Sequence, residues 1–485
     1  MLAQSKSKKP EVTVSKGNTP KESLAKGIER LGGLSRFIDE GEQVFIKLNL
    51  NIPSGFPSNT NFEVLEALIA SCKETGAKKI YLGSFPLKGI PIKTISDLMN
   101  LEEFFKIVGA ELAFLDNSDD YNKKDINQEQ LKKIKYDSLI KIEINDKEFL
   151  IPKVVLNSDK FITVNQINVN PLFRFNSSLL NSYSIISTKY QEIKKSKSGN
   201  KDYISLDQYK KDLISNILDV FTIKQPNLII NDLFYVLEGA GPYIYKDSNL
   251  KKTGLMIIGN DAIAVDFVTM QVLNLEFNDS ELIEQARKNN IPIAEFSNIK
   301  VLGEKIEDLK TDIELCVSNL EKIQIKNFSI KSGNYCSGCF KQAYHILNLM
   351  KTYMGKDLKY NLNNSFLFGE NPIEPENISN ILLFGDCAVN STKNYNFRKI
   401  PIEPKKTTKG KVKKKVMKEK KLKKEKSNKN ILDLPGCPPG IFNSLKLILK
   451  YYGKKNVPNL NFFMNVNKFW VEGKLNDRLK IWERL

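Results

Sequence analysis

The sequence contains little cysteine and no long hydrophobic run. Six cysteines in 485 residues are far too few for a disulfide scaffold. No stretch of about 18 apolar residues occurs, as a membrane-spanning helix would require. The opening residues, MLAQSKSKKPEV, lack the apolar segment of a signal peptide. These absences predict a soluble, cytoplasmic protein without a membrane span.

Histidine is nearly absent as well, because His345 is the only one in the chain. Catalysis through a Ser-His or Cys-His pair therefore has a single candidate base, and nothing near it in the sequence supports such a pair. His345 lies in the helix pattern FKQAYHILNLMKTYM, nine positions after Cys336. That pattern favours a helix-face histidine over a metal ligand or a proton relay.

Positive charge is plentiful but concentrated in one place. Residues 401–430 contain 14 Lys and 3 Glu, which account for +11 of the net charge of +18. Because this stretch has almost no large apolar side chains, we expect 403–430 to be a disordered loop. A solvated insertion is the favoured interpretation. The alternative, contact with nucleic acid through 405–429, would be non-specific and sensitive to salt.

Apolar runs alternate with helix patterns along most of the chain. The run QVFIKLNL, the helix pattern NFEVLEALIASCKETGA and the run KKIYLGS read as strand, helix and strand, with Gly76 near the end of the helix. PNLIINDLFYV and TGLMIIG are apolar on both faces, as strands covered by helices are. The patterns predict an α/β fold with a mostly parallel sheet flanked by helices.

The character of the sequence changes near Asn334, where the clustered cysteines begin. We expect a disordered tail at 1–20, an α/β domain at 21–330 and a smaller carboxy-terminal α/β cysteine domain at 331–485. The lysine-rich loop 403–430 would interrupt the last of these.

Several segments, taken in order, resemble the family catalogued as domain of unknown function 362 over most of 40–310. They are FIKLNLN with Lys47 and Asn49, EVLEALIASCKETGAKKIYLG, IINDLFYVLEGAGP, IIGNDAIAVDFVTMQVLNL and VLGEKIEDLK. The resemblance implies an α/β fold, iron-sulfur clusters in some members and no generally established reaction.

The chain departs from the family pattern at titratable positions. The family tends to carry Thr-His-Pro where Thr-Asn-Phe stands at 60–62, and Gly-Asp where Gly-Ser stands at 83–84. It also carries a stretch with lysine and histidine where NQINVN stands at 165–170. Basic and titratable groups have become amides, so a surface that held an anion in relatives would have lost several partners here.

Four of the six cysteines lie in the last third of the chain, which suggests ligation. Cys336 and Cys339 form a Cys-x2-Cys turn that lets two thiolates converge. Cys387 follows the apolar run ISNILLFGDCAV, so we expect it at the carboxyl end of a strand. Cys437 lies in Pro-Gly-Cys-Pro-Pro before an amphipathic helix, whose amino end offers positive potential to a thiolate.

The Gly-Cys-Pro-Pro string resembles the cluster-binding loop of hydrogenase small subunits and of the related subunit of respiratory complex I. Structural zinc usually takes two close ligand pairs, whereas Cys387 and Cys437 lie 48 and 98 positions beyond Cys339. These features favour a 4Fe-4S cluster on the four cysteines, with zinc and no metal as alternatives. Cys72 and Cys316 lie among apolar neighbours and are interpreted as structural.

In the expected α/β domain, the segment that most suggests a ligand-binding site is Glu-Gly-Ala-Gly-Pro at 238–242, which directly follows a strand pattern. Gly239 and Gly241 could let backbone amides approach a bound cofactor, and a tight turn is an equal alternative.

Candidates for catalysis are the carboxylates Asp232, Glu238, Asp261 and Asp266, which could hold a divalent cation or move a proton. Asp261 is more simply a helix cap.

The sequence thus predicts an iron-sulfur protein with a redox or electron-transfer function, and it leaves open both an iron-sulfur oxidoreductase and electron exchange with a redox partner protein. One alternative is a zinc-stabilised or metal-free protein that binds polyanions through the lysine-rich loop. The other is a metal-assisted enzyme that acts on a small acidic substrate through the carboxylates named above.

Overall fold

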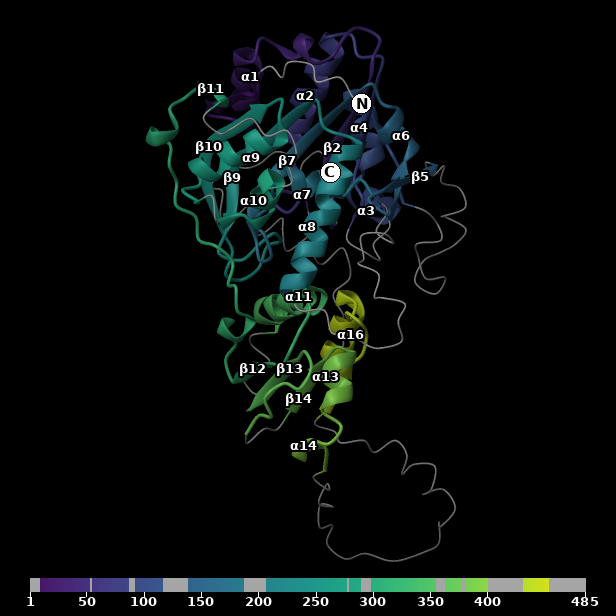
Figure 1. The fold of residues 1–485 in the computed structure, drawn as a ribbon, viewed down its shortest axis with the longest axis vertical. Helices are drawn as coiled ribbons and strands as arrows, with labels where there is room; N and C mark the ends of the chain where they lie inside the picture. The colour runs from purple at the N-terminus through teal and green to yellow at the C-terminus, as the bar shows by residue number, and fades with distance from the viewer. Residues whose placement is uncertain are drawn as a thin grey trace, which may run out of the picture. The chain divides into compact units, whose positions relative to one another are not determined.

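The computed structural model describes residues 9–52, 55–86, 92–116, 138–186, 206–276, 279–288, 298–354, 363–376, 380–399 and 431–452. Contacts divide these residues into two compact units. The first unit runs to Cys316, apart from 206–210, and the second begins at Val317. Figure 1 shows the helices and strands of both.

The first unit is built on a nine-stranded mixed sheet with the order β11-β1-β10-β9-β7-β2-β3-β4, in which β8 pairs with β7. The strands are β1 (Glu11–Lys16), β2 (Gln43–Leu48), β3 (Lys79–Gly83), β4 (Glu111–Leu112), β7 (Lys160–Asn170), β8 (Arg174–Phe175), β9 (Leu228–Glu238), β10 (Asn249–Gly259) and β11 (Lys300–Gly303). Neighbours from β9 through β7, β2 and β3 to β4 run parallel, whereas β10 is antiparallel to both β9 and β1. A separate hairpin pairs β5 (Leu139–Ile144) with β6 (Lys147–Pro152).

Helices cover this sheet on both faces. They are α1 (Pro20–Arg30), α2 (Phe62–Glu74), α3 (Ile92–Met99), α4 (Leu101–Val108), α6 (Lys153–Asn157), α7 (Ser178–Tyr183), α8 (Leu206–Ile223), α9 (Ala262–Val272) and α10 (Glu281–Lys288), with short 3-10 turns at η1 (Leu34–Arg36) and η5 (Ile306–Asp308). On β10, Ile258 faces α1 and the next residue, Gly259, faces α9, so these two helices lie on opposite faces. The predicted α/β fold class is confirmed.

The first parallel unit follows from local sequence. β2, α2 and β3 occupy the segments that the apolar periodicity predicted, and the two strands pair in parallel. Asn61 caps α2 by accepting a hydrogen bond from the backbone of Glu63. The helix ends at Thr75, after which Gly76 takes a φ of +82°, a conformation that suits glycine.

Residues 11–20 are not the disordered tail that the sequence predicted. Residues 11–16 form β1, which lies between β10 and β11 in the sheet. Its short sequence, EVTVSK, offers two apolar side chains and so gives little periodicity, but both edges of the strand find hydrogen-bonded neighbours. Residues 1–8 lie outside the described residues.

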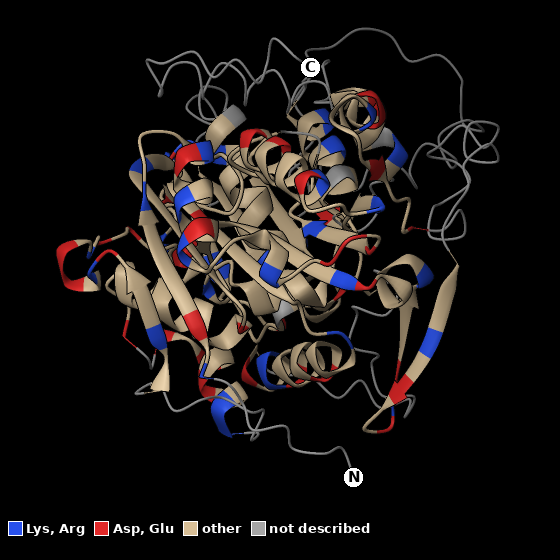
Figure 2. Ribbon diagram, turned by 90° about the horizontal axis from the view of Figure 1, so that it is seen from above, with Lys and Arg blue, Asp and Glu red and all other residues tan. Residues whose placement is uncertain are grey.

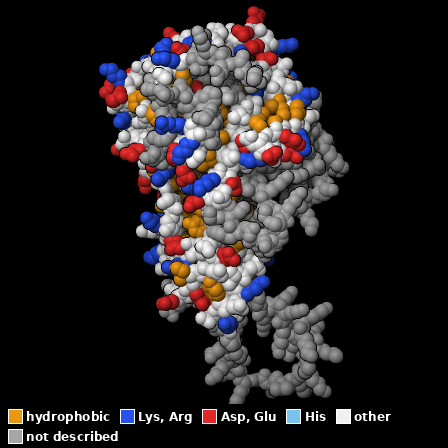
Figure 3. All heavy atoms as spheres, viewed as in Figure 1, with side chains coloured by type: hydrophobic (Ala, Val, Ile, Leu, Met, Phe, Trp, Pro, Cys, Tyr) orange, Lys and Arg blue, Asp and Glu red, His pale blue; other side chains and the backbone are white. Residues whose placement is uncertain are grey.

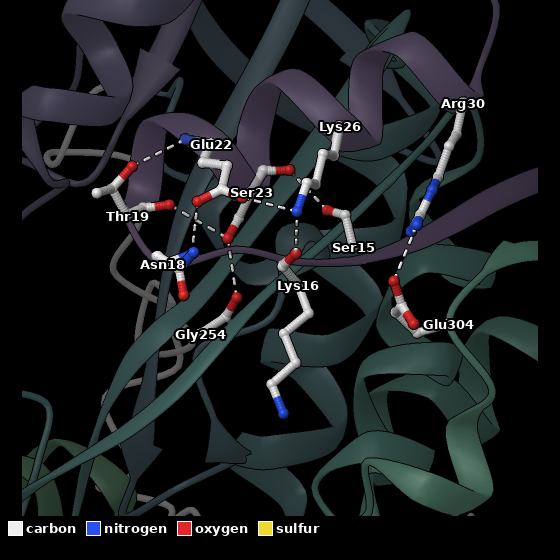
Figure 4. A network of polar contacts seen from close by, with 10 residues as sticks. All are labelled: Ser15, Lys16, Asn18, Thr19, Glu22, Ser23, Lys26, Arg30, Gly254 and Glu304. Atoms are coloured by element: carbon white, nitrogen blue, oxygen red, sulfur yellow. Dashed lines mark hydrogen bonds and ion pairs between the residues drawn. The ribbon is translucent and has the colours of Figure 1, made fainter.

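Helix α1 is fastened to the strands beneath it by the contacts in Figure 4. Thr19 caps the helix by accepting from the backbone of Glu22 at 3.1 Å. The Ser23 hydroxyl donates to the carbonyl oxygen of Gly254 at 2.8 Å, and Arg30 pairs with Glu304 at 2.8 Å. The last two bonds reach segments far away in the sequence, at Gly254 and Glu304, so the amino-terminal region is part of the folded unit.

The second unit contains a four-stranded, fully parallel sheet with the order β12-β13-β14-β15. Its strands are β12 (Phe328–Ser332), β13 (Asn364–Phe368), β14 (Asn380–Phe384) and β15 (Ile431–Leu434), and its helices are η6 (Leu320–Lys322), α11 (Ser337–Tyr353), α13 (Asp386–Ser391), α14 (Asn396–Lys399) and α16 (Ile441–Tyr451). The unit begins earlier than the expected boundary near 331, because β12 pairs with β13 and the Glu321 carboxylate accepts from the backbone of Ser332 at 2.8 Å.

Figure 3 shows charged side chains of both signs interspersed over the described part of one face, and the ribbon in Figure 2 carries basic and acidic positions on many of its elements. The lysine-rich loop expected at 403–430, and with it the possible contact with nucleic acid, lies outside the described residues. Within the described ranges, no helix has both the length and the apolar character needed to cross a membrane.

Candidate functional site

Three strands of the second sheet lead directly into the cysteine-bearing segments. Cys336 and Cys339 follow β12, Cys387 follows β14 and Cys437 follows β15. Because these strands are parallel, their carboxyl ends share one edge of the sheet, where α/β proteins commonly bind ligands. The fold therefore gathers all four cysteines along a single edge.

The Cys-x2-Cys turn lies against the Pro-Gly-Cys-Pro-Pro segment. Cys336 is the N-cap of α11 and Cys339 lies in its first turn. A Cβ atom placed on Gly338 would lie 3.3 Å from the Cγ of Pro438 and 3.7 Å from the sulfur of Cys336. The proline that follows Cys437 thus touches the turn between the first two cysteines.

The loop that carries Cys387 is hydrogen-bonded to the loop that carries Cys437 and lies against Cys339. Gly385 has a φ of +94°, and a Cβ on it would lie 3.3 Å from the sulfur of Cys339. The backbone of Asp386 donates to the carbonyl oxygen of Gly436 at 3.0 Å, and its carboxylate accepts from the backbone of Gly436 at 2.8 Å. The loops after β14 and β15 are therefore joined to each other and lie against Cys339.

The pKa of Cys339 reflects this proximity. Its hydrogen bond with Cys336 raises that pKa, burial raises it further, and so does negative charge on each of the other three thiols. The same hydrogen bond lowers the pKa of Cys336, so the pair shares one proton. The thiol of Cys339 therefore interacts electrostatically with each of the other three.

Helix amino termini add positive potential at this edge. The N-caps of α11, α13 and α16 are Cys336, Gly385 and Gly440, and none of the three caps its helix with a side-chain hydrogen bond. The amino ends of these helices offer positive potential to negatively charged sulfur, and the backbone amides of Gly338 and Cys339, at the start of α11, hydrogen-bond the Cys336 sulfur. Cys339 is buried, Cys336 and Cys387 are half-buried and Cys437 is exposed, so the site is open to solvent on the Cys437 side.

The donor set can be compared with the metals expected from the sequence. Among the described residues, no group of three or more His, Cys, Asp and Glu side chains is placed to hold a metal ion. A single zinc ion with bonds of about 2.3 Å would need its sulfur ligands about 3.8 Å apart. An iron-sulfur cluster holds its thiolates farther apart, because each binds a different iron, and four cysteines are its usual ligands. Four cysteine thiols are thus a donor set that suits an iron-sulfur cluster, and structural zinc takes the same set.

The other cysteines and the histidine do not extend this site. Cys72 is buried within α2, and Cys316 is buried with its sulfur 3.9 Å from the carbonyl oxygen of Gly241, both in the first unit. His345 is buried in α11, and burial lowers its pKa to about 3. It is therefore neutral at ordinary pH.

The first unit contains a buried chain of polar side chains that sequence reasoning did not find. Lys47, on β2, donates to the Asn181 side chain at 2.8 Å and to the Ser84 hydroxyl at 3.0 Å. Asn181 donates to Asn165 at 2.6 Å, and Asn165 donates to Asn231 at 2.7 Å. Each of these residues is less than a tenth exposed.

This series of hydrogen-bonded polar side chains ends at Asp266, on α9. Asn231 donates to its carboxylate at 3.1 Å, and the backbone amides of Ser178 and Leu179 donate to it at 2.8 and 3.1 Å. Burial lowers the pKa of Lys47 and raises the pKa of Asp266 to about 6. The sequence signal was the presence of polar residues within apolar strands, which packing alone would not place there.

Residues 44–271 match the family model described as Domain of unknown function (DUF362). The resemblance inferred from the sequence is confirmed over this segment. The DUF362 segment reaches from β2 into α9. It contains every residue in the series of hydrogen-bonded polar side chains from Lys47 to Asp266, whereas all four clustered cysteines lie beyond it. The chain matches no curated protein.

Within the DUF362 segment, the candidate carboxylates do not come together. Asp232 follows Asn231 in β9 and therefore points to the opposite face of the sheet. Asn231 bonds Asp266, so Asp266 and Asp232 lie on different faces. Asp261 caps α9 by accepting from the backbone of Ala264 at 2.8 Å.

Glu238 and its glycines serve the protein's own backbone. The Glu238 carboxylate accepts from the Asn249 side chain at 3.0 Å and from the backbone of Glu314 at 3.1 Å. A Cβ on Gly241 would overlap the carbonyl oxygen of Val169, and one on Gly239 would overlap that of Asp247. These contacts support the tight-turn interpretation of this part of the DUF362 segment over a cofactor loop.

Proposed function

We propose that the second unit binds an iron-sulfur cluster, most simply 4Fe-4S, and that the protein transfers electrons. The observation that carries the proposal is the convergence of three cysteine-bearing segments at the carboxyl edge of one parallel sheet. The four cysteines are 336, 339, 387 and 437, the set that the sequence singled out.

Each part of the site has a role in this proposal. The four thiolates would hold the iron atoms, and the amides at the starts of α11 and α16 would stabilise the negative charge of cluster and ligands. The bound cluster would supply one-electron chemistry. Exposure of Cys437 gives a partner protein a direct approach for electron exchange.

A reducing compartment such as the cytoplasm suits this proposal. No disulfide joins any of the six cysteines, and thiolates must stay reduced to bind iron.

The test is anaerobic purification of the full chain, followed by analysis of iron, acid-labile sulfide and the visible absorption spectrum. We expect a coloured protein with iron and sulfide in equal amounts. Cys387→Ala and Cys437→Ala should each lose most of the iron. Cys72→Ala and Cys316→Ala are matched controls that should keep it, because those two cysteines lie in the first unit.

The opposite result is equally clear. A colourless protein that carries one equivalent of zinc, or one whose iron content is the same in all four variants, would contradict the proposal.

A further inference from the structure

Four buried polar atoms of the first unit that lack a hydrogen-bond partner lie on β7, on β9 and on the 55–61 loop that contacts both strands. They are the Ser58 hydroxyl oxygen, the Asn61 amide nitrogen Nδ2, the Gln166 amide oxygen Oε1 and the Asp232 carboxylate oxygen Oδ2. Each residue is at most 2% exposed. Folded proteins pair nearly all of their buried polar atoms, so such a group indicates a binding site.

Two of these residues are neighbours in the sheet. Gln166 on β7 and Asp232 on β9 are paired in register. The Gln166 nitrogen Nε2 donates to the carbonyl oxygen of Tyr235 at 3.0 Å, which fixes the amide, and its oxygen Oε1 is left without a partner. Asp232 accepts from the backbone of Phe234 at 2.9 Å through Oδ1 and leaves Oδ2 without a partner.

The loop at 55–61 crosses these two strands and carries the other two residues. Asn168 on β7 donates to the carbonyl oxygen of Pro57 at 2.6 Å, next to Ser58. The ring of Phe56 packs against Tyr235 on β9, with 5.8 Å between centroids.

Asn61 is held at the other end of this loop. The preceding Thr60 donates its hydroxyl to the carbonyl oxygen of Val164 on β7 at 3.4 Å. The Asn61 oxygen caps α2 by accepting from Glu63, which leaves Nδ2 without a partner.

The charge around Asp232 favours a positive ligand. The Asp232 carboxylate would repel an anion, whereas a cation would compensate its charge. Three of the four unpartnered atoms are oxygens from a carboxylate, an amide and a hydroxyl, the ligands that hard divalent cations prefer.

We propose that Asp232, Gln166 and Ser58 bind a hard divalent cation, Mg²⁺ or Ca²⁺, between the 55–61 loop and strands β7 and β9. Asn61 donates to a water molecule on the ion. The site shares only Asp232 with the carboxylate cluster suggested by the sequence, and it does not depend on the iron-sulfur proposal.

Manganese binding to the full chain tests this site, because Mn²⁺ replaces Mg²⁺ and its free concentration can be followed by electron paramagnetic resonance. We expect one Mn²⁺ per chain to be displaced by Mg²⁺ or Ca²⁺. Asp232→Asn should weaken this binding at least tenfold. Asp261→Asn makes the same charge change but keeps the helix cap, so it should bind as the wild type does.

Gln166→Met provides an independent check, because it removes a ligand oxygen and no charge. It should also weaken Mn²⁺ binding at least tenfold, whether or not Asp232→Asn folds. Equal affinity in the wild type and in the Asp232 or Gln166 variant would overturn the proposal. A crystal soaked in Mn²⁺ that shows only a water molecule among these atoms would do the same.

Discussion

Replacing Asn165 by leucine would break the buried polar chain at its centre. Asn165 accepts from Asn181 at 2.6 Å and donates to Asn231 at 2.7 Å. Leucine has a similar size but can do neither. The Asn181 nitrogen and the Asn231 oxygen would then lose these bonds in a region where the two residues are 4% and 0% exposed.

The expected cost follows from those two atoms. A buried donor or acceptor left without its partner costs about 1–3 kcal/mol. With two of them, Asn165→Leu should lower the free energy of unfolding by about 2–6 kcal/mol. The remaining contacts of Asn165, with Thr163 and the Ile230 carbonyl oxygen, are longer at 3.5 and 3.3 Å and add little.

Urea denaturation of the full chain, followed by far-ultraviolet circular dichroism, measures this change. The matched experiment adds Asn231→Leu and the double variant. Removing both partners of a bond leaves fewer unpaired atoms than removing one, so the double variant should cost less than the sum of the single ones by about 1–3 kcal/mol. A loss below about 1 kcal/mol for Asn165→Leu, or strict additivity, would refute this account of the chain.

Three further predictions concern other parts of the molecule. Gly385→Ala should lower the free energy of unfolding by about 1–2 kcal/mol, because a φ of +94° disfavours a side chain, and should lower the iron content by crowding Cys339. The control is Gly440→Ala, which has open space around the added methyl group and should keep both stability and iron. Unchanged stability and iron in the Gly385 variant would count against the site. Burial lowers the pKa of His345 from 6.5 to about 3, so between these pH values the unfolded protein binds a proton that the folded protein does not. The contribution of His345 to the free energy of unfolding is therefore largest above pH 6.5 and falls by about 1.4 kcal/mol per pH unit as the pH drops from 6.5 toward 3. His345→Gln should lack that contribution in acid denaturation, and identical pH profiles would contradict it. Asp261→Ala should cost about 1 kcal/mol in thermal or urea denaturation, and Asp261→Asn close to nothing; similar losses for both would show that capping is not the main role of Asp261.

Local periodicity was enough to predict the elements whose side chains repeat clearly. The β2-α2-β3 unit and the helix cap at Asp261 depend on residues a few positions apart, and both are found in the structure. β1 was missed because its stability comes from β10 and β11, which lie hundreds of positions away in the chain.

The candidate sites divide in the same way. The sequence by itself determined the α/β class, the resemblance to the domain of unknown function and the choice of four cysteines, since composition and spacing are local properties. Which polar residues meet was decided by tertiary structure alone. The pleat of β7 places Asn165 and Gln166 on opposite faces of the sheet, and the register with β9 sets Asn165 beside Asn231, in the hydrogen-bonded series that ends at Asp266, and Gln166 beside Asp232. That outcome depends on pairing between distant strands, which no short stretch of sequence contains.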